Sequence, residues 1–410
     1  MSTRRLTENW TDIAAQLLKI GATAYGGPAI MGVMQAELQE KRHWVSRERF
    51  VEGLSLVNML PGATAAQLSI FLGYARGGWW GGLLGGLCFV LPGFLVLMAL
   101  TMGYAALGVT PMLRGALYGL GPVVLGIYLV AVYRLGRAAL STRAQAVIAI
   151  AAAVAVYASP LGIVSILLLA GGVGLWLFHS RKLGVVVLVP LAAGLAVLHL
   201  VARSAPVPVA LPAPAVADAP AAGLTQIGLF LLKVGAFTFG GGLTMIAFIQ
   251  DQVVSQWNWL TPQEFIDGLA LGQLTPGPVL MVAAYVGYKV AGLAGAVIGG
   301  VAAFLPSFVM MLAILPAFDR ARKLVWTRAA LRGISPAVIG VLAVSLVRLA
   351  PHAVPDVFAL VTLAATVVVL MVWRVGTIKV MLGGAVLGIA RSRLLALPVT
   401  RSLLSTVTRS

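Results

Sequence analysis

Cysteine, histidine and acidic side chains are scarce in this sequence, and their scarcity excludes several classes of protein. The single cysteine, Cys88, has no partner for an intramolecular disulfide. The histidines are scattered along the chain without the spacing of metal or haem ligands; they are His43, His179, His199 and His352. We therefore expect no metal site, no bound cofactor and no catalytic cluster of titratable residues.

Charged residues are also few, and apolar residues take their place. Only 10% of the 410 residues are charged, whereas about a quarter are charged in an average soluble domain. Apolar residues make up 60%, and the mean hydropathy is +0.99. A soluble fold of this length would leave too much apolar surface in water. The composition predicts an all-α polytopic membrane protein, with the lipid bilayer as its solvent.

The formal net charge of +17 reflects 29 basic against 12 acidic residues. The basic residues cluster between apolar stretches, as in the cytoplasmic loops of membrane proteins. Two such clusters are Lys41, Arg42, Arg47 and Arg49, and then Arg320, Arg322 and Lys323. This distribution favours a role in membrane topology and argues against nucleic acid as a partner. No signal-peptide cleavage site follows Arg4 and Arg5, so no removable leader is expected.

The sequence repeats itself at a constant spacing of 214 or 215 residues, and such repeats define the architecture of a chain. The matching segments are 18–22 with 232–236, 25–28 with 239–242, 50–54 with 265–269, and 61–62 with 276–277. We expect an N-terminal repeat over 1–201, a Pro/Ala-rich linker over 202–223 and a C-terminal repeat over 224–410.

A membrane span needs about 20 apolar residues, and the chain offers several such stretches. We expect spans at 78–107, 112–134, 143–158, 160–179, 183–201, 292–316, 328–348, 356–373 and 376–390. Segment 183–201 has no counterpart in the second half. The loop at 37–49 is basic and its counterpart at 251–264 is not, so we infer that the halves have inverted topology. By this count the basic C-terminal tail, with Arg391, Arg393, Arg401 and Arg409, lies outside.

Segments 10–40 and 47–76 and their counterparts are each interrupted by Gly-Gly or Pro-Gly. We interpret each as two half-helices that meet at a break, which must face protein or water. Helix N-termini near Pro28, Pro61, Gly242 and Pro276 would then present free N–H groups to an anion. The alternative is that these residues only permit kinks and close packing.

Helix dipoles alone contribute about 0.3–1 kcal/mol per helix end, less than the cost of dehydrating an ion. Cationic side chains are therefore required. Lys19 and Lys233 precede the Gly-Gly breaks within apolar segments and are the favoured candidates, although snorkelling to the membrane surface would also explain them. Two arginine pairs are weaker candidates near span ends: Arg114 with Arg328, and Arg134 with Arg348.

Glu52 and Asp267 form a repeated carboxylate pair near the start of the second broken segment of each half. They are candidates for proton coupling, for balancing nearby cations or for stabilising a helix N-terminus. Neutral hydrogen-bonding side chains lie close to the Pro-Gly breaks; they are Asn58, Gln67, Gln273 and Thr275.

At these motifs the chain resembles the chromate ion transporter family. The matching motifs are Tyr25-Gly26-Gly27-Pro28, Leu60-Pro61-Gly62, the segment Phe239 to Leu243, and the segment Gln273 to Pro278. Two motifs depart from the family pattern: Ile30-Met31 stands where many members have a histidine, and Val57-Asn58 stands in place of Cys-Gln.

The resemblance implies a secondary transporter that exports chromate, a tetrahedral dianion, across the bacterial inner membrane. Sulfate or another oxyanion is the alternative substrate, and a membrane-embedded enzyme is the alternative of another class. Oligomeric state stays open, a homodimer included. The predicted substrate-binding residues are Lys19, Gly26, Gly27, Pro28, Asn58, Pro61, Gly62, Lys233, Gly240, Gly241, Gly242, Gln273, Pro276 and Gly277.

Overall fold

The computed structural model describes residues 2–106, 110–159, 161–204, 223–317, 325–373 and 375–396. These residues form helices and connecting turns, with no strand among them. The first half contains α1 Ser2–Thr23, α2 Gly27–Met34, η1 Gln35–Lys41, α3 Arg47–Met59, α4 Thr64–Ala106, α5 Pro111–Ala139, α6 Arg143–Ala158, α7 Ile163–Phe178 and α8 Arg181–Ser204. The all-α prediction is confirmed.

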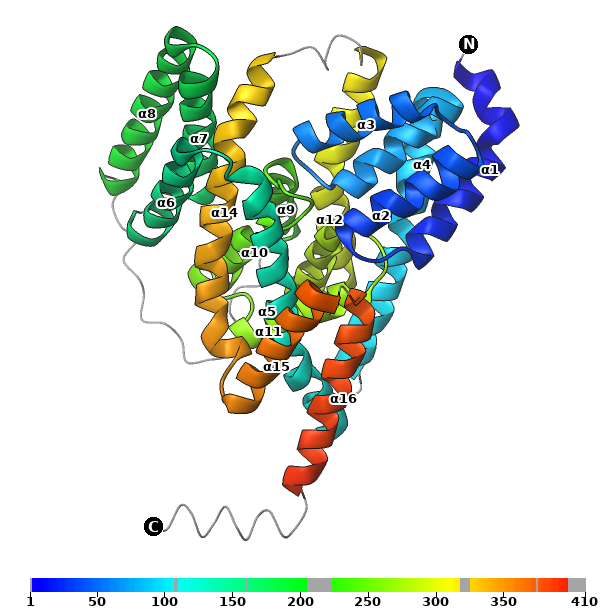
Figure 1. Ribbon diagram of the computed structural model, residues 1–410, viewed down its shortest axis with the longest axis vertical. Helices are drawn as coiled ribbons and strands as arrows, with labels where there is room; N and C mark the ends of the chain where they lie inside the picture. Colours follow the sequence, from blue (N-terminus) through cyan, green and yellow to red (C-terminus); the bar gives the residue numbers. More distant parts are fainter. Residues whose placement is uncertain are drawn as a thin grey trace.

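The second half repeats this order without a counterpart of α8. It contains α9 Leu224–Ala236, α10 Thr244–Ile249, η2 Gln250–Gln256, α11 Pro262–Leu274, η3 Val279–Met281, α12 Val282–Ile314, η4 Leu315–Ala317, α14 Val325–Ala353, α15 Val357–Val368, η5 Val369–Trp373 and α16 Thr377–Ala396. In Figure 1, the long later part of α4 (residues 79–106) runs downward and its counterpart in α12 (residues 293–314) runs upward, as an inverted repeat requires.

Four helical stretches among the described residues are long and apolar enough to cross a bilayer: Thr64–Ala106, Pro111–Ala139, Val279–Ala317 and Trp326–Ala353. In two of them the chain folds back on itself, at Gly77–Gly78 in α4 and at Ala291–Gly292 in α12, where the backbone leaves helical geometry. The parts before and after each bend pack together, with Gly73 against Gly81 and Gly287 against Gly295. The bends lie at equivalent positions, 214 residues apart. They separate the broken segments from the full spans at the boundaries that the hydropathy pattern predicts.

The first helix of each half ends beside the middle of a long helix of the same half. α1 packs along α4, where Gly21 lies directly against the carbonyl of Phe89. α9 packs along α12 in the same way, with Gly235 against the carbonyl of Ala303. Glycine permits this close backbone approach because it has no side chain. The breaks that follow α1 and α9 therefore lie at mid-depth of α4 and α12.

The two halves exchange helices. α5 of the first half packs mainly against α15 and α16 of the second, whereas α14 packs against α6 and α7 of the first. Figure 1 shows α5 and α14 side by side near the centre, running in opposite directions. Buried apolar residues from both halves form one continuous core. Each half thus contributes to the surroundings of the other half's central helix.

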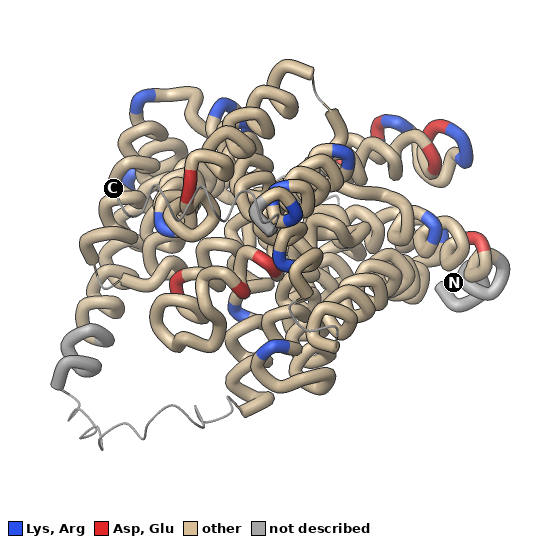
Figure 2. Tube along the Cα trace, turned by 90° about the horizontal axis from the view of Figure 1, so that it is seen from below, with Lys and Arg blue, Asp and Glu red and all other residues tan. Residues whose placement is uncertain are grey.

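Several expectations lie outside the described residues. The linker 202–223 is described only at its ends, where 202–204 continue α8 and Gly223 precedes α9. The basic cluster Arg320, Arg322 and Lys323 and the tail residues Arg401 and Arg409 are also outside the described ranges. In the described part, Lys and Arg outnumber Asp and Glu, and long stretches of helix carry no charge (Figure 2).

Candidate functional site

The predicted breaks are present in both repeats, and three of the four helix starts lie later than predicted. α2 begins at Gly27, next to Pro28 as expected. α4 and α10 begin at Thr64 and Thr244, after Pro61 and Gly242. The helix expected near Pro276 begins with the 3-10 turn at Val279. At each of these three breaks, at least one glycine has a positive φ angle. A positive φ is not compatible with a right-handed helix, so the helix begins only after the last such glycine.

The four breaks meet in pairs at the centre of the molecule. The amide N of Gly62 donates a hydrogen bond to the carbonyl of Thr238 at 2.6 Å. At the equivalent position, the amide of Gly277 donates to the carbonyl of Ala24 at 3.0 Å. Each bond joins a Pro-Gly break of one half to the first break of the other. These bonds satisfy backbone groups that could not remain unpaired inside a membrane.

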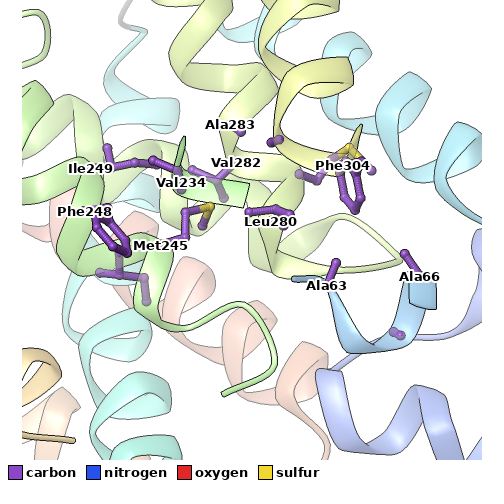
Figure 3. Packing of buried hydrophobic residues seen from close by; sticks show 14 of the residues in the cluster. Ala63, Ala66, Val234, Met245, Phe248, Ile249, Leu280, Val282, Ala283 and Phe304 are labelled. Carbon is purple, nitrogen blue, oxygen red and sulfur yellow. The ribbon is translucent and has the colours of Figure 1, made fainter. Parts of the chain in front are cut away.

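The geometry at Gly62 and Gly277 requires glycine. Their φ angles are +121° and +99°, a region that side chains disfavour. Beside Gly62, Ser307 of α12 accepts a hydrogen bond from the amide of Ala63 at 3.0 Å. Figure 3 shows buried apolar residues around this junction, with Ala63 and Ala66 near the segment that carries Leu280. The junction is therefore a tightly packed, hydrogen-bonded unit.

A central cavity of about 670 Å³ adjoins this junction. Equivalent residues of the two halves line it, including Gly26 with Gly240 and Asn58 with Gln273. Its remaining polar or backbone contributors are Thr64, Tyr128, Arg134, Gly241, Ser335 and Thr377. A mostly apolar wall with a few converging polar groups is typical of a small-ligand site.

Among the described residues that line the central cavity, Arg134 is the single charged one, and none is a carboxylate. The Arg134 Nη2 atom donates to the carbonyl of Leu370 at 2.8 Å, which fixes one side of the guanidinium group. Its other donors are available to a ligand, because no carboxylate in the described chain pairs with Arg134. Nearby, the Gln273 side chain donates to the Tyr128 hydroxyl at 3.0 Å. The cavity thus combines one cation with neutral hydrogen-bonding groups, a combination suited to an oxyanion.

An outer cavity of about 920 Å³ continues from the central one. The two share Gly26, Ala29, Arg134, Leu370 and Thr377. The outer cavity adds two further cations, Arg137 and Lys379. Positive charge therefore marks the path from the protein surface to the centre.

The structure does not bring Lys19 and Lys233 into either cavity. Lys19 is exposed on α1, and Lys233 is half-buried on α9. Each lies within electrostatic range of an acid of its own half, Glu37 for Lys19 and Asp251 for Lys233. Of the three residues, Arg134 lines the cavities and the two lysines do not.

The two predicted carboxylates lie outside the cavities and in different surroundings. Glu52 forms an ion pair with Arg49 at 3.3 Å, and both side chains are partly exposed. Asp267 is only 5% exposed. It accepts hydrogen bonds from the Tyr104 hydroxyl at 3.1 Å and from the Gln263 side chain at 3.0 Å. Asp267 is thus a buried carboxylate held by neutral donors.

The other predicted residues divide between cavity and framework. Of the break residues, Gly26, Asn58, Gly240, Gly241 and Gln273 line the central cavity. Five others form the breaks without lining it, namely Pro61, Gly62, Gly242, Pro276 and Gly277. The surroundings of Gly27 and Pro28 lie outside what the structure describes. Gln67 and Thr275 hydrogen-bond to backbone carbonyls beside the breaks, and Arg114 and Arg328 are exposed near helix N-termini.

Each of the two motifs that depart from the family pattern contributes one residue to the lining of the central cavity, Met31 and Asn58 respectively. The other residue of each motif, Ile30 or Val57, is buried next to it in the chain. Sequence reasoning missed Tyr128, Arg137, Thr377 and Lys379. A tyrosine within an apolar span was a usable signal for Tyr128, since a buried hydroxyl needs a partner. Nothing local marks Lys379, which only the exchange of helices brings close to Arg134.

Comparisons with known proteins match both repeats of the chain to one family. The family model described as chromate transporter matches residues 11–175 and 225–389, one match for each repeat. A chromate transport protein of Cupriavidus metallidurans is 32% identical over 387 residues, which cover 92% of each chain. A chromate transport protein of Pseudomonas aeruginosa is 34% identical and covers 83% of this chain and 81% of its own. No solved structure matches the chain.

Proposed function

This chain belongs to the chromate transporter family, and on that premise we propose that it exports chromate across the bacterial inner membrane. The observation that carries the proposal is the cavity beside the four joined breaks, in which Arg134 is the single charged residue of the described lining. A guanidinium group can donate two parallel hydrogen bonds to an oxyanion. Asn58 and Tyr128 line the same cavity and are placed to bind further oxygens.

The membrane potential supplies enough energy for export. Moving one charge through 100 mV is worth about 2.3 kcal/mol, so a dianion gains about 4.6 kcal/mol. At about 1.4 kcal/mol per decade, this sustains an outward gradient of roughly a thousandfold. The proposal therefore needs neither nucleotide hydrolysis nor an obligatory proton.

Sulfate is the second candidate substrate, because it shares the tetrahedral shape and the double charge of chromate. The cavity walls carry one cation and neutral donors, and these groups recognise charge and oxygen atoms rather than the central atom. Sulfate is therefore expected to compete with chromate for the same site.

Radiolabelled chromate uptake into everted membrane vesicles tests the proposal. We expect accumulation that requires both this protein and an imposed potential, positive inside the vesicle, and that excess sulfate reduces. Vesicles without the protein and vesicles treated with an ionophore are the controls. Absence of protein-dependent accumulation, with verified membrane insertion and an intact potential, contradicts chromate export. Sulfate accumulation without chromate accumulation would identify the alternative substrate.

A proton step, where one exists, is assigned to Asp267 rather than Glu52, because Asp267 is buried and has no cationic partner at ion-pair distance among the described residues. Asp267→Asn should keep potential-driven chromate uptake within about twofold of the rate of the unchanged protein. It should remove any additional chromate uptake that an acidic vesicle lumen produces. Glu52→Gln is the matched control and should change neither. Persistence of the pH-driven component in Asp267→Asn would refute this assignment.

A further inference from the structure

The outer cavity has an unusual concentration of positive charge for a chain with so few charged residues. Arg134 and Arg137 come from the C-terminal part of α5, and Lys379 comes from the first turn of α16. Tyr25 and Tyr133 also line this cavity, and its described lining contains no Asp or Glu. None of the three cations pairs with a carboxylate in the described part of the chain.

Two helix N-termini add to this charge. Gly26 precedes α2, and Gly376 and Thr377 stand at the start of α16, and all three residues line the outer cavity. The free N–H groups of a helix N-terminus carry partial positive charge. These groups reinforce the positive charge of the three side chains.

Comparison of the two halves shows what such a position binds. Arg134 and Arg348 are equivalent residues, and they donate to the equivalent carbonyls of Leu370 at 2.8 Å and Val156 at 3.2 Å. Arg348 also pairs with the carboxylate of Asp251 at 3.5 Å. The equivalent of Asp251 in the first half is Glu37, which pairs instead with Lys41 at 2.6 Å.

The second half therefore places its own carboxylate beside the repeated arginine, and the first half leaves that arginine without one. The other two cations of the outer cavity have no basic counterparts, because Pro351 and Ser165 stand at the positions equivalent to Arg137 and Lys379. The arginine position is thus one that accepts an oxyanion. Among the described residues, two more cations lie beside a cavity at Arg134, namely Arg137 of the first half and Lys379 of the second.

We propose that the outer cavity is a second binding site for tetrahedral oxyanions, which holds the anion at Arg137 and Lys379 and passes it to the central cavity through Arg134. The identity of the transported anion rests on the proposed function, but the binding of an oxyanion such as sulfate does not. Because the two cavities share Arg134 and Gly26, an anion can move between them without losing contact with positive charge. Concentrated charge of this kind raises the local concentration of an oppositely charged ligand and its association rate.

The double variant Arg137→Gln/Lys379→Gln tests the site, with Arg143→Gln as the matched control. Arg143 is exposed at the start of α6, near the same end of α5, and lines neither cavity. Sulfate binding to the full chain in nanodiscs of zwitterionic lipid is measured by calorimetry. We expect two binding events in the unchanged protein and in the control, and loss of the salt-sensitive event in the double variant.

Transport provides the second readout. Chromate uptake at low substrate should fall about tenfold in the double variant, whereas uptake at saturating chromate should stay within about twofold. Equal behaviour of the double variant and Arg143→Gln in both assays overturns the proposal. A salt-sensitive site that appears only in nanodiscs with anionic lipid, and that sulfate does not occupy, also overturns it, because the ligand is then a lipid phosphate.

Failure of the proposed function gives a different pattern. Suppose that the unchanged protein takes up no chromate, and that the double variant lacks the salt-sensitive sulfate site of the unchanged protein. The proposal of an outer site is then supported, and the proposal of chromate export is refuted. If the unchanged protein takes up chromate and the double variant binds sulfate as the control does, chromate export is supported and the outer site is refuted.

Discussion

Arg134→Gln should reduce chromate uptake at low substrate by about tenfold to a hundredfold while leaving the protein folded in the membrane. Arg134 is the cation shared by both cavities, and a hydrogen bond to a charged group is worth about 1.5–3 kcal/mol. At about 1.4 kcal/mol per decade, this range corresponds to the expected loss. Initial rates of uptake into everted vesicles at several chromate concentrations provide the measurement.

Arg114→Gln is the matched control, because Arg114 lies on the same helix, is exposed and lines neither cavity. Arg134→Lys should give an intermediate loss, since lysine keeps the charge and cannot reproduce the planar fork of donors. Uptake by Arg134→Gln at the rate of the unchanged protein, with equal expression, would remove this residue from the substrate path.

Gly62→Ala should nearly abolish uptake and lower the thermal stability of the purified protein. A Cβ atom at this position would lie 2.3 Å from the Ser307 hydroxyl oxygen and 2.7 Å from the Gln67 side-chain nitrogen. The φ angle of +121° adds strain of about 1–3 kcal/mol for a residue with a side chain. Relief of this strain would disturb the bond from Gly62 to Thr238 that joins the two halves.

Gly277→Ala distinguishes the effect of backbone strain from the effect of a steric clash between the new Cβ atom and its neighbours. Gly277 has a comparable φ of +99°, but a Cβ atom added there would meet no other atom within 4 Å, so only the strain remains and the loss of stability should be smaller. Ser307→Gly combined with Gly62→Ala should recover part of the activity, because glycine already stands at the equivalent position, Gly93. Normal uptake and thermal stability of Gly62→Ala would show that the junction tolerates a side chain there.

Much of the fold could be predicted from the sequence because the duplication marks equivalent positions. Two copies of each Gly and Pro motif reveal the breaks, and the register predicts which residues of the halves correspond. The bend at Gly77–Gly78 and its counterpart follow from the hydropathy boundaries. The delayed helix starts were not predictable in the same way, because the sequence does not show which glycines adopt positive φ angles.

The cations of the site were harder to predict. Lys19 stands out in the sequence because it interrupts an apolar segment, but the rotation of that helix about its axis decides whether its side chain faces a cavity or the surface. The buried residues Ile13, Leu17 and Ile20 share one face of this helix, and Lys19 lies off that face. Helical periodicity was therefore a usable signal that Lys19 points away from the core. Arg134 and Lys379 become neighbours only because α5 packs against the other half, and no local pattern encodes that exchange.

The central claim is that the substrate anion binds beside the four joined breaks, in contact with Arg134. The most direct measurement is an experimental structure of the chain with bound chromate, in which the anomalous scattering of chromium locates the ion. We predict a chromium peak in the central cavity, within hydrogen-bonding reach of Arg134 through the chromate oxygens, with a further peak in the outer cavity. A single peak away from both cavities, for example beside Lys19, would contradict the account.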